Sequence, residues 1–566
     1  MWIPFRKKQH KKRGKELFPE EILIDSGNLP KYAGDGGGRM HRSLDAWVFP
    51  VLAFGFVLVL IVFGGRAVQL MAMEGKEYRE LSENNMLSHA PVFAERGVIY
   101  DRNGVELAWN VPYVREGISD TFFDRQYAST TGMAHVLGYV RMPARDSSGF
   151  LYRYNIEGVA GVEATYNDLL SGKNGTKIVE TSVTGERLSE SVFEKASPGE
   201  SLTISIDTEL QSKLHDTIAK LAEDVPFVGG AGIIMDIHTG ELLAMTSVPE
   251  YDSQAIVSGD SDAISGFVFD ERQPYLNRVL NGQYTPGSII KPVLAYAAMK
   301  EGLVSENTTF YSSGSIRLEN PYNPGEYTVF RDWKAHGTVD VRRALAVSSN
   351  VYFYYIGGGF EEQEGLGISK IAQYMRLFGF GSPTGFASVD GEAMGTVPTP
   401  EWKAEAFPQD PDWRIGDTYH TSIGQYGFQV TPMQIVRMVA AFANGGTLLT
   451  ARLETQHTPY GARQLDLDPY ILSVVREGMR AAVTEGTAKG LNVDYVNVAA
   501  KTGTAEVGYS KAHVHSWATG FFPYENPRYA FVVVMEHGPR ENVLGGVYVM
   551  RTLLDWMRYN RPEYFE

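Results

Sequence analysis

The chain has 566 residues, of which 43% are hydrophobic and 21% charged, a balance typical of a folded protein and not of a disordered one. It contains no cysteine, which excludes disulfides, thiolate zinc sites and a cysteine nucleophile. The net charge is -15, yet residues 1–43 hold ten Lys and Arg against five Asp and Glu. A basic amino terminus before an apolar run is typical of a membrane orientation signal, and no aromatic platform accompanies it, so we expect no nucleic-acid partner.

The apolar run from Ala46 to Gly65 carries no charge and is bounded by Asp45 and Arg66. As a helix it would be about 30 Å long, the thickness of a hydrocarbon core. A cleaved signal peptide is the alternative. However, the segment 1–45 is too long for the charged n-region of a signal peptide, and no small-x-small cleavage site follows the apolar run. We therefore predict a cytoplasmic tail over 1–45 and a single uncleaved membrane anchor over 46–68, with the remaining chain outside the cytoplasm.

Two short segments are typical of β-hairpins. Asn103-Gly104 separates apolar stretches, and His238-Thr239-Gly240 separates the apolar segments 232–236 and 242–247. Between the hairpins, Thr208 to Glu223 has helical spacing. Near the end of the chain, strands are expected over 499–504, 516–522 and 529–536, and a helix over 547–558. This order predicts an α+β fold with helices on a mostly antiparallel sheet.

Ser288-Ile289-Ile290-Lys291 is the first of three short motifs that carry chemistry. It follows Thr285-Pro286-Gly287, a turn signal, and residues 289–299 are apolar enough to form a buried helix. Ser288 would then sit at a helix amino terminus, where the dipole favours developing negative charge, with Lys291 on the same face. Taken alone, the motif is more often simply an N-cap serine followed by a surface lysine.

The second and third motifs are Ser348-Ser349-Asn350 and Lys501-Thr502-Gly503-Thr504. One offers a hydroxyl and an amide, the other a cationic strand edge. Strand periodicity places Lys501 and Gly503 on one face. Gly503 leaves room for the close approach of a substrate or of the serine's helix.

The three motifs in this order resemble those of serine β-lactamases and penicillin-binding proteins. The flanking sequence is similar to class B penicillin-binding proteins, which are monofunctional transpeptidases. The matching segments are Arg96-Gly97 with Asp101 to Gly104, Arg125-Gln126-Tyr127, His135 to Val140, and Gly158, Gly161, Glu163, Tyr166 and Asn167. The resemblance implies a penicillin-binding/β-lactamase-like transpeptidase domain over 201–566 and an elongated pedestal domain over 69–200.

Within class B, Arg331-Asp332-Trp333-Lys334 and His336-Gly337 resemble the elongation-specific subfamily, penicillin-binding protein 2. The segment between Ala108 and Arg125 is short where this subfamily usually carries a longer head. Some members hold a zinc ion through two Asp, a His and a Cys; here Asp332 and His336 match, but Ser349 and Ser312 occupy the other two positions. Two ligands are too few for a structural zinc, so we expect no metal and no cofactor, with Asp332 and His336 bonded to each other or to the backbone.

The resemblance also implies the roles of the site residues. Ser288 is the nucleophile and Lys291 its base, which must be neutral and therefore desolvated or near a second cation such as Lys501. Ser348 relays a proton to the leaving amine, and Asn350 orients Lys291 and the substrate amide. Lys501, Thr502 and Thr504 bind the terminal carboxylate, and the N–H groups of Ser288 and Thr504 form the oxyanion hole.

The function implied is a D,D-transpeptidase that cross-links peptidoglycan stem peptides during cell elongation and is inhibited by β-lactams. A division-specific class B transpeptidase, a membrane-bound β-lactamase and a β-lactam sensor or scaffold are the alternatives. No motif identifies the additional glutamate of a class A β-lactamase, and the intact triple motif argues against an inactive scaffold. The implied partners are stem peptides, the membrane, a glycan polymerase of the SEDS family and other elongation-complex proteins.

Overall fold

The computed structural model describes residues 46–566 except 77–78, 80–86, 115–120, 148–150, 183–186, 321–322, 390, 456–460 and 509–510. These residues fall into two compact units, one ending at Met86 and one spanning Leu87–Glu566. The predicted cytoplasmic tail lies outside the described residues, as does the middle of the shortened head segment. The boundaries drawn between anchor, pedestal and transpeptidase domains stay predictions.

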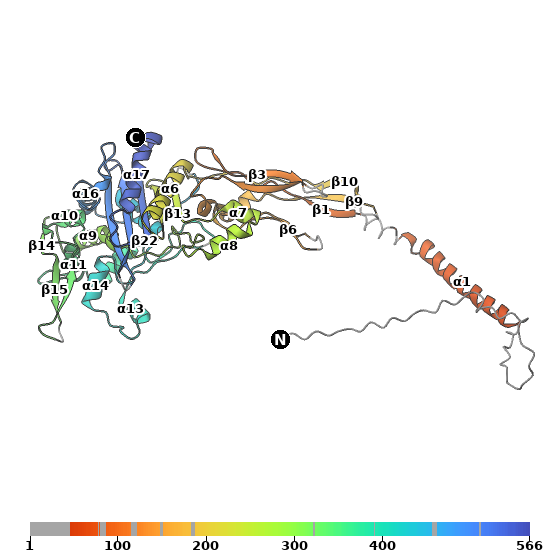
Figure 1. The fold of residues 1–566 in the computed structure, drawn as a ribbon, viewed down its shortest axis with the longest axis horizontal. Helices are drawn as coiled ribbons and strands as arrows, with labels where there is room; N and C mark the ends of the chain where they lie inside the picture. Colours follow the sequence, from red (N-terminus) through yellow and green to blue (C-terminus); the bar gives the residue numbers. More distant parts are fainter. Residues whose placement is uncertain are drawn as a thin grey trace, which may run out of the picture. The chain divides into compact units, whose positions relative to one another are not determined.

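In the described part of the first unit, the long helix α1 spans Val48–Ala72 (Figure 1). Its side chains are mostly apolar and none of them is buried, so the helix does not pack against a hydrophobic core within the described residues. It is long and apolar enough to cross a membrane and continues past Arg66, where the uncharged run ends. A helix of this kind fits the single membrane anchor that the sequence predicts.

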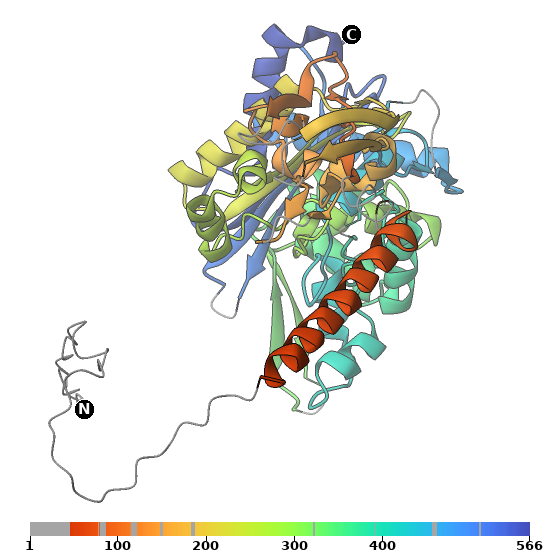
Figure 2. The same cartoon turned by 90° about the vertical axis from the view of Figure 1, so that its right-hand side faces the viewer.

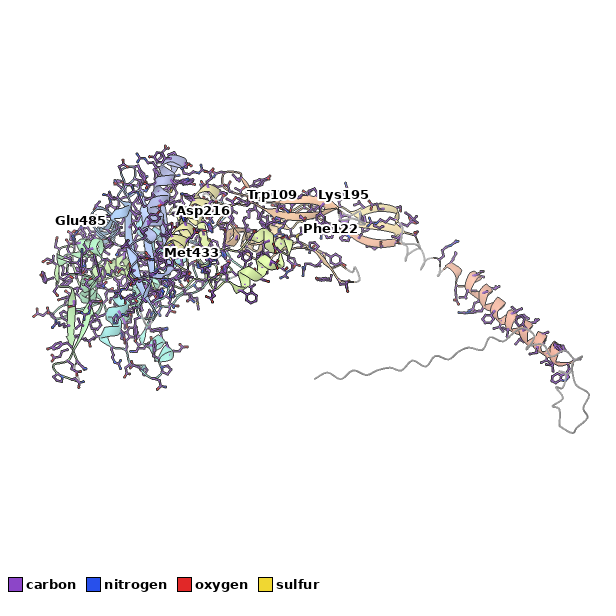
Figure 3. All side chains as sticks on the ribbon, in the orientation of Figure 1. Trp109, Phe122, Lys195, Asp216, Met433 and Glu485 are labelled. Atoms are coloured by element: carbon purple, nitrogen blue, oxygen red, sulfur yellow. The ribbon has the colours of Figure 1, made fainter. Side chains whose placement is uncertain are left out.

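The second unit begins with two small sheets. One has the strand order β1-β9-β10 and the other β11-β2-β3-β4. Trp109 and Phe122 lie on the neighbouring strands β3 and β4 (Figure 3). The bounds in this part are β1 Leu87–Val92, β2 Ile99–Tyr100, β3 Glu106–Val114, β4 Thr121–Tyr127, α3 Ala134–Leu137, β5 Val140–Arg141, β6 Ala144–Arg145, β7 Leu151–Arg153, β8 Glu157–Gly158, α4 Gly161–Thr165, α5 Asn167–Leu170, β9 Gly175–Thr181, β10 Arg187–Glu194 and β11 Leu202–Thr203.

Glu163 is a buried carboxylate that links separate segments of this region. Its carboxylate accepts from Arg96 Nε at 2.5 Å and from Arg125 Nε at 2.7 Å, and none of the three side chains is exposed. The three residues belong to the three segments that resemble the amino-terminal signatures of class B proteins. A buried carboxylate with two guanidinium partners holds distant parts of the chain in one arrangement.

A five-stranded antiparallel sheet of order β13-β12-β22-β21-β20 forms the centre of the remaining chain (Figures 1 and 2). The predicted hairpin pairs β12 with β13, and the three predicted carboxyl-terminal strands complete the sheet. Its strands are β12 Gly229–Asp236, β13 Leu242–Val248, β20 Ala499–Val507, β21 His513–Phe522 and β22 Tyr529–Pro539. The α+β architecture expected from the sequence is confirmed.

Helices cover both faces of this sheet. Helices α6 (Thr208–Asp224) and α17 (Gly546–Asn560) pack on the face that presents Ile234 and Val533. Helix α15 (Pro432–Ala443) and the short turn η2 (Gly287–Ile290) pack on the face that presents Ile233 and Val532. Asp216 of α6 and Met433 of α15 mark the two covering layers in Figure 3. Because neighbouring strand residues alternate between faces, Lys501 and Gly503 lie on the face of β20 that packs against η2.

The other elements are helices and short strands between β11 and the carboxyl terminus. Their bounds are α6 Thr208–Asp224, α7 Ser253–Ser258, α8 Ser261–Phe269, η2 Gly287–Ile290, α9 Lys291–Lys300, β14 Phe310–Ser312, β15 Ser315–Glu319, β16 Tyr327–Arg331, β17 Gly337–Val339, α10 Val341–Val347, α11 Asn350–Gly358, α12 Gly367–Leu377, α13 Pro400–Ala406, α14 Ile415–Ser422, α15 Pro432–Ala443, β18 Thr447–Leu448, β19 Arg463–Gln464, α16 Pro469–Thr484, η3 Lys489–Leu491, α17 Gly546–Asn560 and η4 Pro562–Tyr564.

Candidate active site

Ser288 lies in a short 3₁₀ turn, η2, that leads directly into α9. The sequence predicts a helix from Ile289, whereas the α-helix begins at Lys291. Pro292 supplies the reason: it has no N–H to reach the Ser288 carbonyl, and the Lys291 N–H bonds that carbonyl instead. Ser288 is half-buried, and its side chain makes no hydrogen bond to any residue that the structure describes.

Lys291 and the second motif meet directly. Lys291 Nζ donates to the Ser348 carbonyl at 2.9 Å and to Asn350 Oδ1 at 2.8 Å, and it lies 3.5 Å from Ser348 Oγ. The lysine is completely buried and also lies over the Phe353 ring, 5.1 Å from its centre. The ammonium is therefore removed from water but keeps hydrogen-bond acceptors.

Ser348 connects the first and third motifs. Lys501 Nζ, which is also completely buried, donates to Ser348 Oγ at 2.8 Å. Ser348 itself has φ 57° and ψ 40°, the left-handed conformation that a residue with a side chain rarely adopts. This backbone geometry places its hydroxyl between the two lysines, so the three predicted motifs converge on one point.

Burial lowers the pKa of Lys291 to about 7, although the negative charge of Asp332 opposes that shift. Burial also lowers the pKa of Lys501 well below its ordinary value, and the charge of Lys291 adds to the effect. The predicted second cation thus acts in the other direction: Lys291 depresses Lys501. Desolvation is the main reason that a neutral amine exists beside Ser348 near neutral pH.

Gly503 packs against the serine's turn. A Cβ at this position would lie 2.8 Å from Ile289 Cγ2 and 2.9 Å from the Pro286 carbonyl oxygen. The glycine is therefore required for the approach of strand β20 to η2. On the opposite face, Thr504 is exposed and Thr502 is half-buried, with its hydroxyl 2.6 Å from the Thr487 hydroxyl.

Thr487 and Asp332 are the polar residues that the motifs did not single out. Thr487 lies in the turn after α16 and reaches Thr502 from outside the three motifs. Asp332 accepts from Ser349 Oγ at 2.7 Å and from the Val351 N–H at 3.0 Å. In the sequence, Asp332 belongs to a subfamily motif and to the metal-ligand positions, and the predicted bond of Asp332 to the backbone is confirmed.

The family's zinc positions come together in space, but the residues present do not fit the ion. Ser312, Ser349 and His336 surround Asp332, whose Oδ1 lies 3.6 Å from His336 Nε2. One carboxylate, one imidazole and two hydroxyls do not make a structural zinc site. Within the described part of the chain, no group of three or more His, Asp and Glu residues lies close enough to hold a metal ion.

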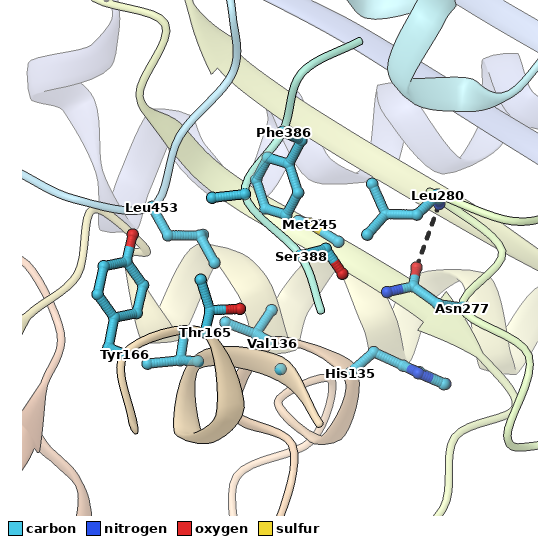
Figure 4. Close-up of a pocket in the computed structure, with 13 residues that line it drawn as sticks. His135, Val136, Thr165, Tyr166, Met245, Asn277, Leu280, Phe386, Ser388 and Leu453 are labelled. Atoms are coloured by element: carbon cyan, nitrogen blue, oxygen red, sulfur yellow. Dashed lines mark hydrogen bonds between the residues drawn. The ribbon is translucent and has the colours of Figure 1, made fainter. Parts of the chain in front are cut away.

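A small cavity lies elsewhere, between α3–α4 and the sheet region (Figure 4). Its volume is about 20 Å³, roughly that of one water molecule and too small for a substrate. His135 at its edge bonds the Pro274 carbonyl at 2.9 Å, and burial lowers the pKa of His135 to about 3. The cavity is part of the internal packing and not of the candidate site.

Fold and site together define a serine acyl-transfer protein of the penicillin-binding type. The Penicillin binding protein transpeptidase domain family matches residues 230–548, and the Penicillin-binding Protein dimerisation domain family matches residues 117–204. The chain belongs to the penicillin-binding protein transpeptidase family.

Individual proteins and solved structures that are similar to this chain are also penicillin-binding transpeptidases or come from a peptidoglycan synthase complex. The peptidoglycan D,D-transpeptidase MrdA of Haemophilus influenzae is 29% identical over 90% of this chain and 91% of its own. The penicillin-binding protein PBP2 of Helicobacter pylori, solved in complex with MreC, is 28% identical with a TM-score of 0.68, covering 84% of this chain and 100% of that one. A chain from a peptidoglycan synthase complex that coordinates polymerisation and crosslinking is 29% identical, with a TM-score of 0.67, covering 90% of this chain and 97% of that one.

Proposed function

We propose that this chain is a membrane-anchored peptidoglycan D,D-transpeptidase of the elongation type, with Ser288 as its nucleophile. The observation that carries the proposal is that Lys291 and Lys501 both contact Ser348. Lys291 lies one helical turn after Ser288, and the chain belongs to the penicillin-binding protein transpeptidase family. The similarity to a peptidoglycan D,D-transpeptidase supports the substrate class.

In the first half-reaction, neutral Lys291 takes the proton of the Ser288 hydroxyl as Oγ attacks the carbonyl of the penultimate D-alanine. The N–H groups of Ser288 and Thr504 stabilise the oxyanion, which typically contributes about 3–4 kcal/mol per donor. The C–N bond then breaks, and the proton passes from Lys291 through the Ser348 hydroxyl to the departing D-alanine amine. An ester on Ser288 remains.

In the second half-reaction, the amine of a neighbouring stem peptide attacks this ester. The amine loses a proton through Ser348 and Lys291, and the Ser288 oxygen leaves with a proton returned from Lys291. One amide bond has replaced another, so no nucleotide is consumed. Asn350, bonded to Lys291 Nζ at 2.8 Å, holds the base in place through both halves.

The substrate carboxylate has a defined place in this scheme. Lys501, Thr502 and Thr504 would receive it. The pKa of Lys501 is lowered by burial and by Lys291 in the free protein. A bound carboxylate favours the charged form of Lys501, so binding restores the cation that burial disfavours.

The proposal includes a place in the cell envelope. Helix α1 would anchor the protein in the cytoplasmic membrane with the amino terminus inside and the catalytic part outside, as the basic first 43 residues favour. A SEDS-family glycan polymerase and other elongation-complex membrane proteins are the proposed partners. The neighbours solved with MreC and within a synthase complex support this choice.

Intact-mass analysis of the full chain in detergent, after incubation with a labelled penicillin, tests the function. A stable adduct that maps to Ser288 and disappears in Ser288→Ala is the expected result. Rapid hydrolysis of the penicillin would identify a β-lactamase instead. No adduct at all would identify a non-catalytic scaffold.

The partner proposal is tested separately, by replacing Ala46–Gly65 with an unrelated apolar helix. We expect this replacement to reduce co-purification of the polymerase without changing penicillin labelling. Full retention of co-purification would show that the helix is only a tether and leave the region before the transpeptidase domain as the contact.

A further inference from the structure

Asp332 is a buried carboxylate immediately after β16, outside the three catalytic motifs. Its side chain has no exposed surface. One oxygen, Oδ2, accepts from Ser349 Oγ at 2.7 Å, from the Val351 N–H at 3.0 Å and from Ser312 Oγ at 3.3 Å. A carboxylate placed here without such donors would cost several kcal/mol, so this one is built into its surroundings.

These bonds hold the turn that carries Ser348 and Asn350. Ser348 is in the left-handed region, a conformation that persists only when neighbouring contacts enforce it. Ser349 donates to Asp332 and also accepts from the Tyr352 N–H, while Val351 N–H donates to Asp332 from the first turn of α11. Asp332 therefore fixes the turn at Ser349 and Val351, while Lys291 bonds the Ser348 carbonyl and Asn350 Oδ1.

The charge of Asp332 also reaches Lys291. Among the described residues, the charged or titratable groups that interact electrostatically with Lys291 are Lys501 from β20 and Asp332 and His336 from the segment between β16 and β17. Burial alone would raise the pKa of Asp332, but the N–H groups of Asn350 and Val351, the charge of Lys291 and the Ser349 hydroxyl outweigh it and lower the pKa. Burial lowers the pKa of His336, so at neutral pH the negative charge of Asp332 is not cancelled by this neighbour.

We propose that Asp332 is a positioning residue for acyl transfer, which fixes the Ser348–Asn350 turn and places a buried negative charge near Lys291. This inference rests on the proposed function. Asp332 touches neither the nucleophile nor the substrate in this scheme; it acts through Ser349, Val351 and its field at Lys291. Without the charge of Asp332, desolvation would make Lys291 neutral at a lower pH. Without the carboxylate, the Ser348–Asn350 turn would also be held less firmly.

The test compares Asp332→Asn with Asp340→Asn in the full-length protein. Asp340 also caps a helix, accepting from the Arg343 N–H at 2.7 Å, and its substitution removes the same charge without touching the site. The rate of Ser288 acylation by a fluorescent penicillin is measured from pH 5 to 9. In Asp332→Asn the acid limb should move down by about one pH unit and the plateau rate should fall, while Asp340→Asn should match the wild type.

An acid limb that stays in place in folded Asp332→Asn would overturn the inference, whatever happens to the rate. Ser349→Ala provides a second arm that keeps every charge. It should lower the plateau about tenfold with an unshifted acid limb in a protein that remains folded by circular dichroism, whereas Ser205→Ala, another buried serine outside the three motifs, should leave the plateau unchanged. An unchanged rate in Ser349→Ala would also overturn the inference. Failure of the wild type to acylate would instead overturn the proposed function.

Discussion

The hydroxyl oxygens of Thr487 and Thr502 lie 2.6 Å apart, so a residue from the turn after α16 orients a side chain of the third motif. We expect Thr487→Val to lower the acylation rate about tenfold, because Thr502 loses the partner that aims its hydroxyl at the substrate carboxylate. Thr487→Ser should retain most of the rate. The measurement is fluorescent-penicillin labelling over time.

Thr484→Val is the matched control, since that exposed hydroxyl bonds only its own helix, at the Ala481 carbonyl. Equal rates in the two valine variants would show that the Thr487–Thr502 pair has no part in binding the substrate.

Lys291→Arg should reduce acylation by at least about two orders of magnitude. Arginine keeps the positive charge but cannot give up its proton near neutral pH, and general-base catalysis typically contributes on this scale. Stopped-flow acylation with the variant's melting temperature as a folding check gives the answer. Near-native acylation would assign the base to another group.

The acylation rate of the wild type should depend on pH through Lys291. The pKa of Lys291 is lowered by burial to about 7, and only the neutral amine accepts the Ser288 proton. The rate should therefore level off above pH 8 and fall about tenfold for each pH unit below 6. A rate independent of pH between 5 and 8, with the fold intact by circular dichroism, would contradict this assignment.

Glu163→Gln should destabilise the region before the transpeptidase domain by about 3–5 kcal/mol, because Arg96 and Arg125 would then face each other in a dry interior. Thermal unfolding of the purified protein measures the effect. Glu157→Gln, an exposed position nearby, should unfold like the wild type. Equal melting temperatures for the two variants would mean that water or another group replaces the lost charge.

The purified protein should contain no stoichiometric zinc. Ser312 and Ser349 offer hydroxyls where zinc-binding relatives have a carboxylate and a thiolate, and the Asp332 carboxylate is already satisfied by hydrogen bonds. Elemental analysis of protein purified without chelator is decisive: one zinc per chain would refute the expectation.

Much of the fold could be predicted because alternation is a local property. The hairpin of β12 and β13 and the face shared by Lys501 and Gly503 follow from strand periodicity. The α-helix α9 begins at Lys291 and not at the predicted Ile289, because an apolar run alone does not show the effect of Pro292. Its missing N–H changes the bond that the Ser288 carbonyl receives.

The features of the site that the sequence did not predict are contacts between elements that are distant in the chain. The left-handed conformation at Ser348 could not be predicted, because the residue is a serine and not a glycine. The residues next to Asp332 in the sequence do not indicate that it bonds Ser349 and Val351. Thr487 meets Thr502 only because α16 ends beside β20. Such contacts depend on where separate elements meet, which a single sequence does not report.

The tight contact between Gly503 and the turn of Ser288 also bears on antibiotic resistance. Any side chain at position 503 would collide with Ile289 and displace the nucleophile, so escape from a β-lactam is closed at this position. The packing that constrains Gly503 does not extend to the exposed side of the same strand, where Thr504 lies. An inhibitor that draws its affinity from the backbone around Gly503 would therefore leave the bacterium few routes of escape.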